Sequence, residues 1–300
     1  VTATAGIGVR ASAINGLALV NLNAGKVLAT GGDGIFASSS GTGGVTVNTA
    51  LGTDVDAQTV GANGIKATTT GASGDVNVTV LGTVNNVGFA GKDAIFAQVA
   101  NAASTSNINI SSQNAVFGLT NGIEATSNGL GSITVNANTT AVGGGVVLGF
   151  QNGIITSLTN AAGAGNITIT AGDVTGTFGG VIQSNAAGAT GITAKNAGTG
   201  NTTVTVNKAT GVFAFGTNTI GIDAEATTGT VTVSTSGPSI TASNTDIFAT
   251  GLGVINVTNS SQLLSATNIG INAVGGAGPV TVVNTGDEST LTTALIGIRA

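Results

Sequence analysis

The stretch from Gly122 to Val135, GIEATSNGLGSITV, contains both patterns that decide the fold of this chain. It begins with a Gly-Ile-x-Ala motif, passes through a corner rich in Ser, Asn and Gly, and ends in the alternating run Ile133-Thr134-Val135. Alternation of β-branched and polar residues is typical of a strand with one buried face. One such unit cannot bury its own apolar face, so neighbouring units have to cover it.

The Gly-Ile-x-Ala motif recurs along the whole chain, and its second, apolar position marks each copy. Successive copies lie 24 to 31 residues apart, with one longer step of 38 between Ile154 and Ile192. An alternating strand follows each motif, and a weaker apolar segment closes each unit. Stacked units would place the marked residues in one interior ladder. The ladder residues are Val9, Ile35, Ile65, Ile95, Ile123, Ile154, Ile192, Ile222, Ile247, Ile271 and Ile298.

This repeat predicts an all-β fold, a right-handed single-stranded parallel β-helix (β-solenoid) of about ten coils of 24–31 residues, with one longer coil that carries an insertion. Each strand would pair with its counterpart one coil away, about 4.8 Å along the axis. Residues 1–300 are expected to form a single continuous array, and the insertion predicts a protruding loop at 185–199. Neither end has a polar cap, so we expect a piece of a longer array or coils that stack end to end.

The composition excludes several classes of function. Only 6% of residues are charged, with seven Lys and Arg and a net charge of −5, which argues against nucleic-acid binding. The chain has no Cys and no His, so disulfides, ordinary zinc sites and triads that use either residue are excluded. We therefore predict no cofactor and no metal. No apolar run approaches the roughly 18 residues that span a bilayer, so no membrane insertion is expected for this segment.

Carboxylates are the remaining candidates for chemistry. Asp54 and Asp56 alternate along one predicted strand, and Asp223 and Glu225 do the same about six coils further on. We interpret both pairs as solvated surface groups, with weak cation binding and catalysis as alternatives; Lys66, one coil on, is expected near the first pair. Glycosidase chemistry needs two carboxyl groups in a groove, and the sequence indicates no groove. No residue is therefore assigned a catalytic role.

Phe residues repeat at a second position of the unit. Five of them come shortly before the next Gly-Ile motif, which predicts an aromatic stack that fills one interior corner; an exposed strip that stacks on sugars is the alternative. Phe36, Phe96 and Phe248 occupy outward positions of the first motif, as isolated surface contacts or packing points between rods. The five predicted stack residues are Phe89, Phe117, Phe150, Phe178 and Phe215.

Outward positions of the alternating strands form two columns of Thr, Asn and Ser. Thr168 and Thr170 occupy both columns in one coil, and Thr205 and Asn207 are assigned to the columns in the next. Flat Thr-x-Thr arrays resemble those of ice-binding solenoids. Frequent Asn favours ordinary hydrogen-bonded ladders on a solvated face instead.

Units that combine Gly-Ile-x-Ala, a Gly/Asn/Thr-rich corner and Gly-x-Val-Thr-Val, as at 122–135 and 221–233, resemble the passenger regions of bacterial autotransporters and related large surface adhesins. The resemblance covers essentially the whole chain. It implies export through the type V pathway and a non-catalytic structural or adhesive role on the bacterial surface or secreted from it. Partners would be adjoining coils of a longer chain, glycans, or host and neighbour cell surfaces. Three alternatives remain: a self-assembling filament, sheath or biofilm-matrix protein that binds other copies of itself, a polysaccharide-active β-helix enzyme, and an ice-binding protein.

Overall fold

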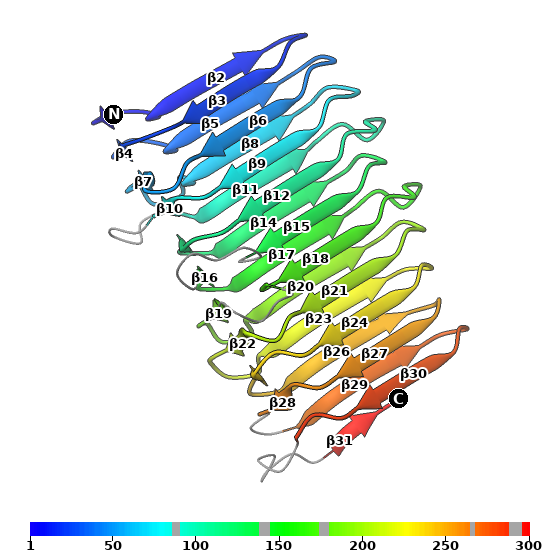
Figure 1. Ribbon diagram of the computed structural model, residues 1–300. Coiled ribbons are helices and arrows are strands. Elements are labelled where there is room, and N and C mark those ends of the chain that lie inside the picture. Colours follow the sequence, from blue (N-terminus) through cyan, green and yellow to red (C-terminus); the bar gives the residue numbers. More distant parts are fainter. Residues whose placement is uncertain (86–90, 138–144, 174–179, 265–267, 288–295) are drawn as a thin grey trace.

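In the computed structural model the chain winds into one stack of strands, from β2 (Val9–Ala13) to β31 (Ile296–Arg299) (Figure 1). The part of the chain that the structure describes contains strands, turns and bends but no helix, and so no helix that could cross a bilayer. The structure describes residues 1–85, 91–137, 145–173, 180–264, 268–287 and 296–300.

Three parallel sheets run along the stack, and each turn contributes one strand to each sheet. The Gly-Ile sheet, built from the first motif, contains β2, β5 (Ile35–Ser39), β8 (Ile65–Thr69), β11 (Asp93–Val99), β14 (Asn121–Ser127), β17 (Asn152–Leu158), β20 (Thr190–Asn196), β23 (Ile220–Ala226), β26 (Thr245–Gly251), β29 (Ile269–Gly275) and β31. The alternating sheet contains β3 (Ala18–Leu22), β6 (Val45–Thr49), β9 (Val76–Val80), β12 (Ile108–Ser112), β15 (Ile133–Ala137), β18 (Ile167–Ala171), β21 (Thr202–Val206), β24 (Val231–Thr235), β27 (Ile255–Asn259) and β30 (Val280–Asn284). The short-strand sheet contains β1 (Thr2–Ala3), β4 (Lys26–Ala29), β7 (Asp54–Ala57), β10 (Thr83–Val84), β13 (Val116–Gly118), β16 (Val146–Gly149), β19 (Gly180–Ser184), β22 (Thr210–Ala214), β25 (Ser239–Thr241) and β28 (Gln262–Leu263).

This arrangement confirms the predicted all-β parallel solenoid. It makes about nine turns, close to the ten coils expected from the motif count. The right-handed sense of the winding stays a prediction.

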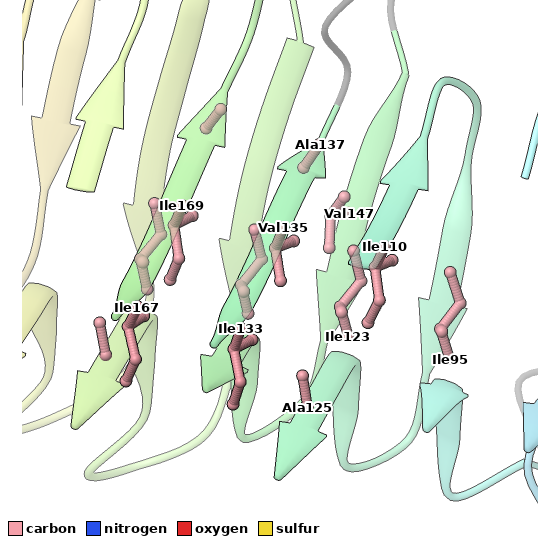
Figure 2. Packing of buried hydrophobic residues seen from close by; sticks show 14 of the residues in the cluster. Ile95, Ile110, Ile123, Ala125, Ile133, Val135, Ala137, Val147, Ile167 and Ile169 are labelled. Carbon is pink, nitrogen blue, oxygen red and sulfur yellow. The ribbon is translucent and has the colours of Figure 1, made fainter. Parts of the chain in front are cut away.

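The interior is filled by the aliphatic ladder. Register pairs its residues in one file, from Val9 opposite Ile35 to Ile271 opposite Ile298. Every ladder residue from Ile35 to Ile271 is fully buried, whereas Ile298 is 45% exposed. Figure 2 shows Ile123 of this file beside Ile110 of the alternating sheet. Burial of one such side chain stabilises the fold by roughly 1.5–3 kcal/mol, and the stacking repeats that gain in every turn.

The corners between the Gly-Ile and alternating sheets also stack. The backbone N–H of Asn107 donates to Asp75 Oδ1 at 2.8 Å, and further along the same corner the N–H of Asn201 donates to Asn166 Oδ1 at 2.8 Å. Glycine is required beside these residues because backbones approach closely: a Cβ at Gly200 would lie 1.9 Å from the carbonyl oxygen of the glycine one turn earlier. The Gly and Asn content of the corners therefore serves turn-to-turn contact.

The longest coil is not built as predicted. Residues 190–196 of the expected loop at 185–199 form β20, and Ile192 is fully buried in the interior ladder. The extra length lies mainly in two connections of eight residues each, 159–166 and 172–179, whereas the connection at 185–189 has five; each turn still delivers its strand in register. The insertion is absorbed by two corners, because the apolar residue on either side has to remain in the ladder.

Register also corrects one outward pair of the alternating sheet. Ile169 pairs with Val204, so Thr203 and Thr205, rather than Thr205 and Asn207, stand beside Thr168 and Thr170. The shift arises because β21 begins with an inward Thr202 in place of an aliphatic residue. The hydroxyl of Thr202 donates to the carbonyl oxygen of Glu225 at 2.8 Å, which satisfies its hydrogen bond inside the stack.

Candidate functional sites

Nine charged side chains of the described residues gather into three lysine clamps. In each clamp one lysine contacts two carboxylates, and the bridge ties neighbouring turns together. Lys26 contacts Asp54 at 2.9 Å and also Asp56; Lys92 contacts Asp93 at 3.1 Å and Glu124 at 3.8 Å; Lys195 contacts Asp223 at 3.1 Å and Glu225 at 2.9 Å.

The first clamp corrects two predictions. The partner of Asp54 and Asp56 is Lys26 of the preceding turn, which lies opposite Asp54 in the register, and not Lys66. The side chain of Asp56 is only 1% exposed, so it is not a solvated surface group. Hydrogen bonds to Asp56 and Asp54 raise the pKa of Lys26 and keep its ammonium charged.

The third clamp contains an acid with a strongly raised pKa, Asp223. Burial raises the pKa of Asp223 from 3.8 to about 6, against the attraction of Lys195 and with the repulsion of Glu225. Its side chain is 8% exposed, so the prediction of a solvated group is wrong here too. Burial alone would lower the pKa of Lys195, but its contacts with Glu225 and Asp223 outweigh burial and raise it.

The second clamp behaves in the same way. Burial, together with repulsion from Asp93, raises the pKa of Glu124. Attraction by Asp93 and Glu124 raises the pKa of Lys92, although burial alone would lower it. All three clamps therefore hold a charged lysine against partly or fully buried carboxylates, an arrangement that links turns.

A groove runs beside the third clamp, where the Gly-Ile strands enter their corners. Its volume is about 620 Å³, within the usual range for ligand sites. Lys195 and Glu225 line it together with two exposed apolar side chains, Leu252 (55% exposed) and Val274 (41%). No motif in the sequence predicts this groove, because it is formed by corners from five consecutive turns.

Two kinds of chemistry are relevant to the groove and the third clamp, proton transfer and metal binding. A carboxyl group with a pKa of about 6 is a suitable proton donor near neutral pH. Asp223, however, is buried and does not line the groove; only Glu225 does, and Lys195 contacts both carboxylates. Within the described residues, no group of three metal-ligating side chains comes together.

A second surface feature lies on the first turns of the Gly-Ile sheet. We call it the cation–aromatic strip: Arg10, Phe36, Lys66 and Phe96, which are register neighbours in that order, with Lys92 beside Phe96. Arg10 Cζ lies 5.4 Å from the centre of the Phe36 ring, and Lys66 Nζ lies 5.7 Å from Phe36 and 5.9 Å from Phe96. Lys92 Nζ lies 5.5 Å from Phe96. Cations and rings therefore alternate along the axis.

The interior aromatic stack does not form from the described Phe residues. Phe150 and Phe215 are 53% and 47% exposed, and Phe117 points outward from β13. Phe215 instead stacks on Phe213, with ring centres 5.8 Å apart. Phe89 and Phe178 lie outside the described residues.

The reason is register in the short-strand sheet. Val116, Val147 and Val212 are fully buried and fill the corner that the stack was expected to fill. Because strand side chains alternate between faces, Phe117 and Phe213, one residue further on, point outward.

The clamps and the strip each have a sequence signal that the motif comparison missed. Lys26 and Lys195 each lie one unit before a carboxylate pair, at the strand position that one acid of the pair occupies in the next unit. Arg10, Phe36, Lys66 and Phe96 all occupy the third position of the Gly-Ile-x-Ala motif or its variant in four consecutive units. A comparison of this chain with protein-family models, curated proteins and solved structures found no significant match.

Proposed function

We propose that this chain is a non-catalytic, autotransporter-passenger-like rod on a bacterial surface or secreted from it, with a structural or adhesive role. The observation that carries the proposal is the unbroken register of the interior ladder from Val9 to Ile298. A continuous ladder gives a long, regular lateral surface on a stiff support, which suits display and contact more than turnover of a small substrate.

The lysine clamps support the same proposal. The carboxylate pairs that an enzyme would use are tied to lysines that bridge turns, so their charge contributes to cohesion of the stack. The resemblance of the repeat units to autotransporter passengers and surface adhesins supports the extracellular location.

The test has two parts. Protease added to intact cells of the source organism should remove the chain from the surface, while cytoplasmic marker proteins stay intact. Beads coated with the folded chain should attach to cells or glycan-coated surfaces, with inhibition by excess soluble chain. Beads coated with the heat-unfolded chain are the control. Protection from external protease would refute the location, and equal attachment of both kinds of bead would refute specific adhesion.

The polysaccharide-active enzyme is favoured by one observation, the raised pKa of Asp223 beside the groove. Incubation of the chain with a panel of polysaccharides tests it directly. Release of reducing ends that Glu225→Gln abolishes would replace the adhesive proposal, and no release leaves the groove without catalytic function.

A further inference from the structure

We infer that the cation–aromatic strip binds an acidic polysaccharide with one carboxylate on every second sugar. The inference rests on the proposed adhesive function and names the chemistry of its ligand. Of seven Lys and Arg in a chain of net charge −5, Arg10, Lys66 and Lys92 belong to this one strip.

Two of these cations are available to a ligand. Lys92 is held by Asp93 and Glu124, whereas Arg10 and Lys66 make no ion pair with any acid of the described chain. Instead, Phe36 lies between them and Phe96 lies on the other side of Lys66. Aromatic rings attract a cation without neutralising its charge. The rings therefore hold Arg10 and Lys66 in place, and both side chains keep their full positive charge.

The spacing of the two cations suits a regular polymer. Arg10 and Lys66 are two strands apart in the register, which places them about 10 Å apart along the axis. That separation is comparable with a disaccharide unit of an extended polysaccharide. Because successive turns stack strand by strand along one axis (Figure 1), a linear polymer can follow the strip.

A column of polar side chains runs beside the strip on the same face. Ser12, Ser38, Thr68 and Gln98 are register neighbours two residues further along their strands. Their hydroxyl and amide groups offer hydrogen bonds to sugar hydroxyls next to the charged column. Ser12 and Ser38 already lie 3.1 Å apart, which shows that neighbouring groups of this column reach each other. The combination of spaced cations and hydroxyls matches an acidic sugar chain.

A second copy of the chain fits this face less well. Six of its carboxylates are held in lysine clamps, and Asp33 and Asp75 accept hydrogen bonds from Asn63 and Asn107. A nucleic acid carries a much denser charge, which the net charge of −5 opposes.

Hyaluronan oligosaccharides, which carry one carboxylate per disaccharide, are the probe. Their binding to the whole chain at low ionic strength should weaken about two- to fivefold in Lys66→Gln and further in the double variant with Arg10→Gln. The matched control is Lys208→Gln, which removes an exposed lysine far from the strip and should leave affinity unchanged. Phe36→Leu keeps every charge but removes the ring between the cations, so it should also weaken binding. Circular dichroism checks that each variant is folded.

Four outcomes would overturn the inference. These are no binding of hyaluronan at low salt, equal losses in Lys66→Gln and Lys208→Gln, tighter binding of single-stranded DNA than of hyaluronan, and concentration-dependent self-association that Lys66→Gln abolishes. If hyaluronan does not bind but coated beads still attach to cells, the inferred polysaccharide site is refuted and the proposed adhesive function stands. If hyaluronan does not bind and the beads do not attach, both the polysaccharide site and the adhesive function are refuted.

Discussion

Replacement of Asp223 by Asn should change the pH dependence of stability in a defined direction. The carboxyl group is buried beside Lys195 and Glu225, and its pKa is raised to about 6 in the folded chain. In the unfolded chain the group returns to its ordinary value of 3.8. Between these two values the unfolded state binds fewer protons than the folded state, so the free energy of unfolding falls as pH rises.

The size of the effect follows from the two pKa values. A difference of about two pKa units corresponds to roughly 3 kcal/mol, and the small exposure of the side chain means that solvent screening reduces it little. The contribution of Asp223 to stability is fully present below pH 4 and is lost as pH rises through 6. Asp223→Asn cannot ionise, so it should gain up to about 3 kcal/mol relative to the native chain between pH 3.5 and pH 7.

Urea unfolding of both proteins at half-unit steps of pH measures this difference, and the carboxyl carbon signal of Asp223 in an NMR titration measures the pKa itself. Lys195→Gln provides a second check. Because the lysine lowers the pKa of Asp223, its removal should move the midpoint of the titration above 6. A constant difference in stability between the native chain and Asp223→Asn across this pH range would refute the assignment, as would a midpoint near 4.

Three further predictions concern the stack itself. Ile123→Ala should lower the free energy of unfolding in urea by about 2–5 kcal/mol, because it leaves a cavity in the ladder, and a loss below 1 kcal/mol would contradict full burial. Gly200→Ala should lower the melting temperature clearly, since its Cβ would meet the Gly165 carbonyl oxygen at 1.9 Å; an unchanged temperature would contradict the close approach. Asn166→Ala should cost about 1 kcal/mol in the same urea assay by removing the acceptor of the Asn201 N–H, and a neutral effect would show that water replaces it.

The fold was readable from the sequence because its determinants are local and repeated. Ile35, Ile65 and Ile123 stand in equivalent motif positions, and stacking is the arrangement that buries all of them. The same repetition made the longest coil hard to place. Nothing in the sequence near Ile192 shows that extra residues are shared by two corners, since that division depends on the path of the neighbouring turns.

The surface was less predictable, because contacts between turns depend on exact register. The partner of Asp54 and Asp56 could be Lys26 or Lys66 from spacing alone, and only the register decides for Lys26. Burial of Asp56 and Asp223 also depends on neighbouring turns. The groove beside Lys195 combines side chains from five turns, none of which has a recognisable motif. The predicted inward position belongs to Val116 and not to Phe117. In a strand, a shift of one residue moves a side chain from the buried face to the outward face.

Distances between spin labels test the stacked register most directly. The chain has no Cys, so pairs of introduced cysteines are unique labelling sites. Thr46 is an outward residue whose column contains Thr168, Thr203 and Thr232 at four, five and six strand steps. Labels on Thr46 paired with each of these residues should give narrow distributions near 19, 24 and 29 Å, rising by about 4.8 Å per turn. Broad distributions, or distances that do not rise in equal steps, would contradict a continuous solenoid.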